Sequence, residues 1–222
     1  MKLKLALIPI VVAVGFPAYV ALHPGVAYAE PRMASGAPIP FAADLANYTI
    51  DPAHTSLYFE IRHLGLSVVH GRINDFSGKV VEDEKDLTKS SIELTAKITS
   101  IDTACPPRDT DLRGKDFFDA DKYPNLTFKS TKIVKKGNGY VLTGDLTIKG
   151  VTKSIEIPFK HYGPLSMKSI PGQPDRIGVV AEPIVIKRLD FGIGNDFKLP
   201  DGTEGASNEV TLRISMEATL DK

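Results

Sequence analysis

Apolar side chains recur at every second position in several short segments of the chain. In residues 55–63, TSLYFEIRH, one set of alternate positions holds Leu57, Phe59, Ile61 and His63. Successive side chains of a β-strand point to opposite faces, so this spacing predicts a strand with one apolar face. The same alternation returns in SIELTAKI, GYVLTGDLTI, KSIEIPF and EVTLRISMEA. These segments predict a sheet that must bury one of its faces.

Turn-forming sequences separate the predicted strands, among them KKGNGY, TIKGVTK and PGQPD. One-sided strands at this spacing are typical of an antiparallel sheet that forms a sandwich or a closed barrel. We count about eight strands, and long sheets of this kind tend to close because closure removes exposed edges. An all-β fold, an antiparallel eight-stranded β-barrel, is therefore predicted.

The segment RDTDLRGKDFFDADKYP, residues 108–124, breaks the alternation because it is rich in charged residues and is interrupted by a glycine and a proline. We predict a short helical insertion here, capped by Asp109 or Thr110 and carrying Leu112 and Phe117 inward. The helix should end before Pro124, because the residue preceding a proline avoids the helical region.

The first 29 residues have the pattern of a secretory signal peptide. A basic start precedes an uncharged apolar run, and Ala27-Tyr28-Ala29 has the spacing of a cleavage site. We expect cleavage after Ala29 and export. The alternative is an uncleaved membrane anchor, which Pro9 and Pro17 disfavour by interrupting the run.

Residues 30–46 are rich in Pro and Ala and are predicted to be a flexible leader before a domain over residues 47–222. Loss of Lys2 and Lys4 with the signal would move the formal net charge from zero to −2. Nucleic-acid binding needs a basic stripe, which this sequence lacks, so no nucleic-acid partner is expected. Cys105 is the single cysteine and cannot form an internal disulfide.

Metal and nucleophile motifs are weak. His54, His63 and His70 lie near one another in sequence, but their spacing is not that of a zinc site, and no metal is predicted. DFFDADKYPN lacks the glycine and glutamate that a calcium loop requires. No nucleophile elbow is present. The acidic run VEDEKD, residues 81–86, is predicted to be a solvated loop.

The interior of the barrel remains the candidate site. A barrel of about eight strands is either filled by its own side chains or holds one small ligand. Ala96, Gly144 and Ala218 are small and would leave room. Periodicity does not measure a void, so a packed core and a ligand cavity both stay open. His63, if it is buried, needs a hydrogen-bond partner, and a ligand head group would supply one.

Several long motifs occur in a recognisable order: YTIDPAHTSLYFEIRHLGLSVVHGRINDFSG, RDTDLRGKDFFDADKYPNLTFKST, YVLTGDLTIKGVTKSIEIPF and KRLDFGI. In these motifs the chain resembles the YceI-like family of exported polyisoprenoid-binding proteins, from Tyr48 to the C-terminus. The resemblance implies a lipocalin-like antiparallel barrel with a long internal tunnel. It also implies a periplasmic carrier or storage protein for an amphiphilic lipid: an isoprenoid, an isoprenoid quinone or a fatty amide.

The resemblance implies no catalytic residue and no cofactor other than the bound lipid. Phe59, Ile61 and His63 would line the tunnel, with Arg188 and Asp190 near its rim. The full set of expected ligand-binding residues is Leu57, Phe59, Ile61, His63, Phe76, Leu94, Ile98, Phe117, Phe118, Phe128, Leu142, Leu146, Ile148, Arg188, Asp190 and Phe191. As partners, transient contact with a membrane and a homodimer stay open.

Two other functions remain as alternatives. One is a lipid-modifying isomerase or hydrolase that uses His63 with Glu60, Arg62 or Asp190, although the alternation places Glu60 on the outer face. The other is an interaction module with a filled core. The loops GNDFKLPDGTEGASNEV and GPLSMKSIPGQPD depart from the family's pattern and leave the head-group preference open.

Overall fold

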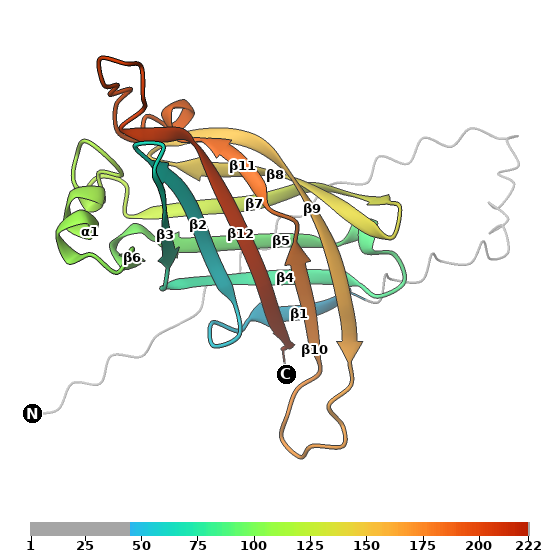
Figure 1. The fold of residues 1–222 in the computed structure, drawn as a ribbon. Helices are drawn as coiled ribbons and strands as arrows, with labels where there is room; N and C mark the ends of the chain where they lie inside the picture. The colour runs from blue at the N-terminus through green and yellow to red at the C-terminus, as the bar shows by residue number, and fades with distance from the viewer. Residues whose placement is uncertain (1–44, 222) are drawn as a thin grey trace, which may run out of the picture. The chain divides into compact units, whose positions relative to one another are not determined.

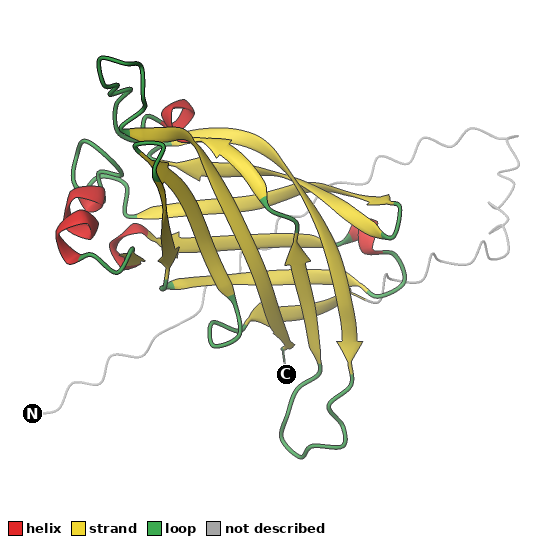
Figure 2. Cartoon of the chain, in the orientation of Figure 1, coloured by secondary structure: helices red, strands yellow, loops and turns green. Residues whose placement is uncertain are grey.

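A computed structural model describes residues 45–221, in which antiparallel strands form a closed barrel with one short α-helix beside it (Figures 1 and 2). The strands are β1 (Leu45–Ile50), β2 (Ser56–His63), β3 (Ser67–Ile73), β4 (Phe76–Asp83), β5 (Ser91–Lys97), β6 (Ile101–Asp102), β7 (Asn125–Lys136), β8 (Gly139–Ile148), β9 (Val151–Leu165), β10 (Arg176–Ala181), β11 (Ile184–Lys187) and β12 (Ala206–Leu220). The helices are α1 (Pro106–Arg113) and the 3-10 turns η1 (Leu87–Lys89), η2 (Ile98–Ser100) and η3 (Arg188–Phe191).

Eight strands close the barrel in the order β1-β4-β5-β7-β8-β9-β10-β12, and β12 pairs back onto β1. The predicted antiparallel eight-stranded barrel is therefore confirmed. Its first strand begins at Leu45, two residues before the predicted domain start. The predicted signal peptide and nearly all of the predicted leader lie outside the described residues.

Strand β12 has a different neighbour at each end. Near its C-terminus, Leu220 pairs with Tyr48 of β1. Farther back, Val210 pairs with Ile61 of β2, and β2 continues the sheet into β3. The β2–β3 ribbon therefore takes over part of the wall at the end of the barrel where β12 begins (Figure 1).

The buried core follows the predicted alternation. On β8, Leu142, Leu146 and Ile148 are buried, whereas Asp145 between them is exposed. Residues at alternate positions share a face of the sheet, so a single apolar cluster fills the inside.

Helix α1 lies earlier than predicted. It begins after Cys105, with Pro106 and Pro107 in its first turn, where proline's fixed φ and missing N–H fit well. The prediction that Asp109 or Thr110 caps the helix was wrong. Asp109 is buried in the first turn, and its carboxylate accepts hydrogen bonds from the backbone N–H and hydroxyl of Thr103. Among residues 45–221, no helix is long and apolar enough to cross a membrane.

The prediction of a solvated loop at VEDEKD was wrong for residues 81–83 and correct for residues 84–86. Strand β4 continues to Asp83, and Glu82 points inward with only 1% of its surface exposed. The Asp83 carboxylate accepts hydrogen bonds from the N–H groups of Lys85 and Asp86 and so forms the turn that follows. The loop therefore starts after Asp83, so it contains Glu84 and Asp86 but not Glu82 and Asp83.

Gly144 permits a close contact inside the barrel. A Cβ atom at this position would lie 2.3 Å from Cζ of Phe128 and 2.7 Å from the carbonyl oxygen of Lys129. Because the backbone oxygen cannot rotate away, we expect Gly144→Ala to lower the free energy of unfolding by about 1–3 kcal/mol. Urea denaturation would measure this loss. Gly178→Ala is the control, since its nearest contact is ordinary at 3.6 Å, and an equal loss there would contradict the steric explanation.

Candidate ligand cavity

A cavity of about 560 Å³ lies inside the barrel, and most of the side chains that line it are apolar. This volume falls in the range of roughly 300–1,000 Å³ that is usual for small-molecule sites. The expected ligand-binding residues that line it are Leu57, Phe59, Ile61, His63, Leu94, Phe117, Phe118, Phe128, Leu142, Leu146, Ile148 and Arg188. The barrel is therefore not fully filled by its own side chains.

Four of the expected residues lie elsewhere. Phe76, Ile98 and Phe191 are buried in the core but are absent from the cavity wall, and Asp190 is exposed. None of these four residues therefore borders the cavity. Alternation along a strand identifies the inward face, but it does not identify the level along the barrel at which the interior is empty.

We place the opening of the cavity at the end of the barrel with the β2–β3 turn and α1, because both contribute exposed residues to the lining. His63 and Ser67 form the last pair of the β2–β3 ladder, and both line the cavity yet are exposed. His63 lines the cavity as expected, but it is exposed rather than buried, because it stands at the rim, where its strand ends. From α1, the exposed Asp111 also borders the opening.

Basic side chains predominate among the charged groups at the cavity wall. Arg62, Arg108 and Arg188 line it together with His63, and Asp111 is the one carboxylate among the described lining residues. The sequence analysis had named Arg62 only as a possible partner of His63 and had not singled out Arg108. Arg108 comes from α1, where its guanidinium donates to the hydroxyl and carbonyl oxygens of Thr103.

Arg188 is buried, with 7% of its surface exposed, and its hydrogen bonds go to backbone carbonyls. Its Nε donates to Ser207 at 2.9 Å and its Nη1 to Ile193 at 2.8 Å. Its Nη2 donates to both Asn195 and Ala206, at 2.8 and 2.9 Å. The guanidinium thus joins the two ends of the loop between η3 and β12.

Burial lowers the pKa of Arg188, while the charges of Glu204 and Asp196 act in the opposite direction. A guanidinium nevertheless stays protonated in proteins. Within residues 45–221 no carboxylate forms an ion pair with it. The cavity wall therefore contains a buried guanidinium that donates to backbone carbonyls and forms no direct ion pair with a described carboxylate.

The opposite end of the cavity is closed. Along β8, β9 and β10, the last lining residues are Leu142, Phe159 and Val179. The next inward positions, Tyr140 and His161, no longer touch the cavity. Tyr140 stacks on Phe159 with ring centroids 5.6 Å apart. Side chains beyond this level therefore fill the barrel and form a floor.

A buried polar pair lies in this floor. Nε2 of His161 is 3.0 Å from Oε2 of Glu82, and the two side chains are 11% and 2% exposed. They come from β9 and β4, which are not neighbours in the sheet, so the pair crosses the interior. Burial, followed by the charge of Glu82, raises the pKa of Tyr48 to about 12, which keeps its hydroxyl neutral.

Removing one member of this pair should destabilise the barrel. His161→Leu leaves the Glu82 carboxyl buried without its partner, and we expect a loss of about 3 kcal/mol in the free energy of unfolding. The double variant Glu82→Met with His161→Leu should regain most of that loss, because apolar replacement of both partners removes the desolvation cost. Denaturant unfolding of both variants at neutral pH tests this. A double variant less stable than the single one would contradict it.

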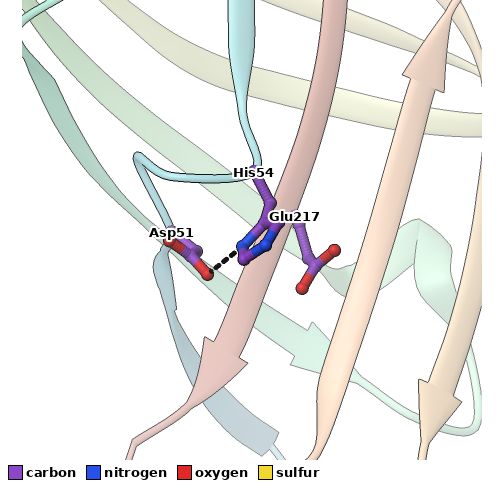
Figure 3. A group of neighbouring side chains, drawn as sticks. All are labelled: Asp51, His54 and Glu217. Atoms are coloured by element: carbon purple, nitrogen blue, oxygen red, sulfur yellow. Dashed lines mark hydrogen bonds and ion pairs between the residues drawn. The ribbon is translucent and has the colours of Figure 1, made fainter.

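Asp51, His54 and Glu217 bring three potential metal ligands within 4.8 Å of one another (Figure 3). Oδ2 of Asp51 lies 2.8 Å from Nδ1 of His54, and this hydrogen bond is the largest cause of the lowered pKa of Asp51. Nη1 of Arg176 contacts Oδ2 of Asp51 at 3.3 Å and also pairs with Glu217. The Arg176 guanidinium contacts both carboxylates, so the cluster acts as an ion-pair network that ties β10 and β12 to the β1–β2 turn.

A closed antiparallel barrel around one apolar cavity with a basic rim defines the class of small ligand-binding β-barrels. Residues 48–218 match the family model described as the YceI-like domain. The chain therefore belongs to the YceI-like family, as the sequence motifs had predicted.

Relatives of similar length support this assignment. The chain is 39% identical over 182 residues to a protein of Vibrio campbellii named UPF0312 protein, covering 81% of this chain and 90% of the relative. A crystal structure of a YceI protein from Campylobacter jejuni has a TM-score of 0.60 at 32% identity, covering 73% of this chain and 90% of that one. A polyisoprenoid binding domain from Saccharophagus degradans shares the fold with a TM-score of 0.57 at 17% identity, covering 80% and 99%.

Proposed function

We propose that this protein is exported and then carries or stores an amphiphilic lipid in the periplasm, with the hydrocarbon chain inside the barrel. The observation that carries this proposal is the apolar cavity, which is closed by a floor at one end and open at a polar rim at the other. The signal-like pattern of residues 1–29 supports export. The Saccharophagus degradans domain is described as polyisoprenoid binding, so isoprenoids are the first ligand class to test, ahead of isoprenoid quinones and fatty amides.

Burial of the hydrocarbon would supply most of the affinity. Each buried CH₂ contributes roughly 0.8 kcal/mol, so about fifteen carbons supply on the order of 12 kcal/mol. Association costs an estimated 4–15 kcal/mol before any net binding is seen. Long-chain ligands therefore bind by partition, whereas short ones do not overcome this cost.

The rim would hold the head group. Arg62, His63 and Arg108 offer N–H groups there, and Arg188 adds a buried guanidinium. Oxygen-rich or anionic head groups fit these donors, because a charged donor makes the stronger hydrogen bonds. The ligand would therefore lie with its polar end at the rim and its tail toward the floor.

The geometry favours binding over catalysis. Glu60 faces away from the cavity and pairs with Arg213 at 2.7 Å. Asp190 is exposed and does not line the cavity. The lining therefore does not bring the proposed carboxylate partners to His63, as an acid–base pair would require.

Native mass spectrometry of protein purified from the exported fraction without detergent tests the proposal directly. A stoichiometric hydrophobic species, identified after organic extraction, would establish binding and name the ligand. A mass that corresponds to the protein alone and stays unchanged after incubation with isoprenoid quinones and fatty amides would refute the proposal. The interaction-module alternative would then be favoured.

Filling the cavity should prevent uptake. Val210 of β12 lines the cavity, whereas Val185 of the adjacent β11 is 58% exposed and points outward. We expect Val210→Trp to reduce lipid occupancy at least about tenfold, because displacing two methylene groups from the wall already costs that much affinity. Val185→Trp is the matched control and should bind normally. Equal occupancy in the two variants, measured by native mass spectrometry, would show that the ligand does not use this cavity.

Changing His63 should alter selectivity between head groups. We expect His63→Leu to shift relative affinities among ligands with different polar ends, while affinity for a plain alkyl chain changes less. His70→Leu is the control, because His70 lies on the neighbouring strand with a 70% exposed side chain and does not line the cavity. Competition binding with matched chains would measure this. Unchanged ratios for every ligand would exclude His63 from head-group contact.

A further inference from the structure

Three apolar side chains project into solvent from two loops at the cavity mouth. Leu66 is 84% exposed in the β2–β3 turn, and Phe197 and Leu199 are 57% and 36% exposed in the loop before β12. Figure 1 shows this second loop extending beyond the end of the barrel. Exposed leucine and phenylalanine side chains gathered on two adjacent loops suggest a contact surface.

The two loops are joined to each other. The N–H of Leu64 donates to the carbonyl of Gly205 at 3.1 Å, which links the β2–β3 turn to the second loop. Within that loop, the Phe197 ring lies so close to Gly205 that a Cβ atom there would be 2.6 Å from its Cδ1. We call the surface formed by Leu66, Phe197 and Leu199 the apolar tip.

The apolar tip adjoins the opening of the cavity. The N–H of Leu66 donates to the carbonyl of His63, which stands on the rim. Ala206, which follows the second loop, also lines the cavity. Arg188 holds both ends of that loop through Ile193 and Ala206. The tip is therefore anchored to the rim.

We propose that the apolar tip inserts into the surface of a lipid bilayer and so places the cavity mouth against the membrane. This inference rests on the proposed function, because a lipid cargo must leave one apolar phase to enter another. The tip consists of projecting side chains rather than a groove, a shape that suits insertion between lipids. A mouth in contact with the bilayer would spare the hydrocarbon chain an exposure to water.

The charges near the tip favour an uncharged lipid surface. Lys198 pairs with Asp196 at 3.5 Å, and Asp201 and Glu204 add negative charge to the same loop. The loop that carries Phe197 and Leu199 therefore lacks the basic cluster with which proteins attract anionic lipids. Insertion would therefore depend on the apolar side chains, and zwitterionic vesicles are the appropriate probe.

The chain contains no tryptophan, so one introduced indole reports on a single position. Phe197→Trp places it in the tip. Ile170→Trp is the control, since Ile170 is 49% exposed in the loop between β9 and β10, away from the lining residues. With phosphatidylcholine vesicles that carry brominated acyl chains, we expect a blue shift and at least a twofold loss of emission for Phe197→Trp. The Ile170→Trp emission should stay unchanged.

Leu66→Ser, added to Phe197→Trp, should weaken vesicle binding about tenfold, because a leucine side chain no longer leaves water.

Unchanged emission of Phe197→Trp, equal quenching of both indoles, or a vesicle-free blue shift that grows with protein concentration would each overturn the proposal. The last result would indicate a second copy of the chain on the tip. Quenching in a protein that takes up no lipid would refute the proposed function while leaving the docking surface intact. Lipid uptake without quenching would refute the docking surface while leaving the proposed function intact.

Discussion

The pairing of β12 with different neighbours at its two ends is the constraint on which the rest of the structure depends. At its C-terminal end β12 pairs with β1, so the sheet closes as a ring of eight strands. At its N-terminal end β12 pairs with β2, and β2 pairs in turn with β3, so these two strands continue the wall. The barrel is therefore built differently at its two ends. The filled floor lies at the end where β12 pairs with β1. The cavity lies at the end where β12 pairs with β2 and the β2–β3 ribbon forms part of the wall.

The barrel could be predicted from the sequence because its main signal is local. Alternation within five to ten residues identifies which side chains point inward, and Phe59, Leu142 and Ile148 all line the cavity as expected. The same pattern did not distinguish Phe59, which borders the cavity, from Phe76, which is packed in the core. That difference depends on the level along the barrel axis. The level of a residue along the barrel axis depends on the stagger between strands that are distant in sequence. The sequence of one strand does not contain that information.

The polar parts of the site could not be predicted for a related reason. A charged side chain is usually solvated, so Glu82 in an acidic run was assigned to a loop. Its partner His161 is separated from it by 79 residues, and only the closed barrel brings them together. Arg188 was expected near the rim from the family motif, but its burial depends on carbonyl groups of the following loop. Every residue has a backbone carbonyl, so the sequence does not indicate which carbonyls will accept such hydrogen bonds.

The two ends of the cavity have opposite consequences for a ligand. At the floor, the stacked rings of Tyr140 and Phe159 and the buried pair of Glu82 and His161 leave no opening among the described residues. Breaking that pair would expose a buried carboxyl to an apolar interior, so the floor resists opening. The rim, in contrast, ends in exposed strand termini. A lipid would therefore load and leave through the same opening, with its head group last to enter and first to leave. Release then requires an acceptor for the hydrocarbon at the rim itself, and this is where the apolar side chains project.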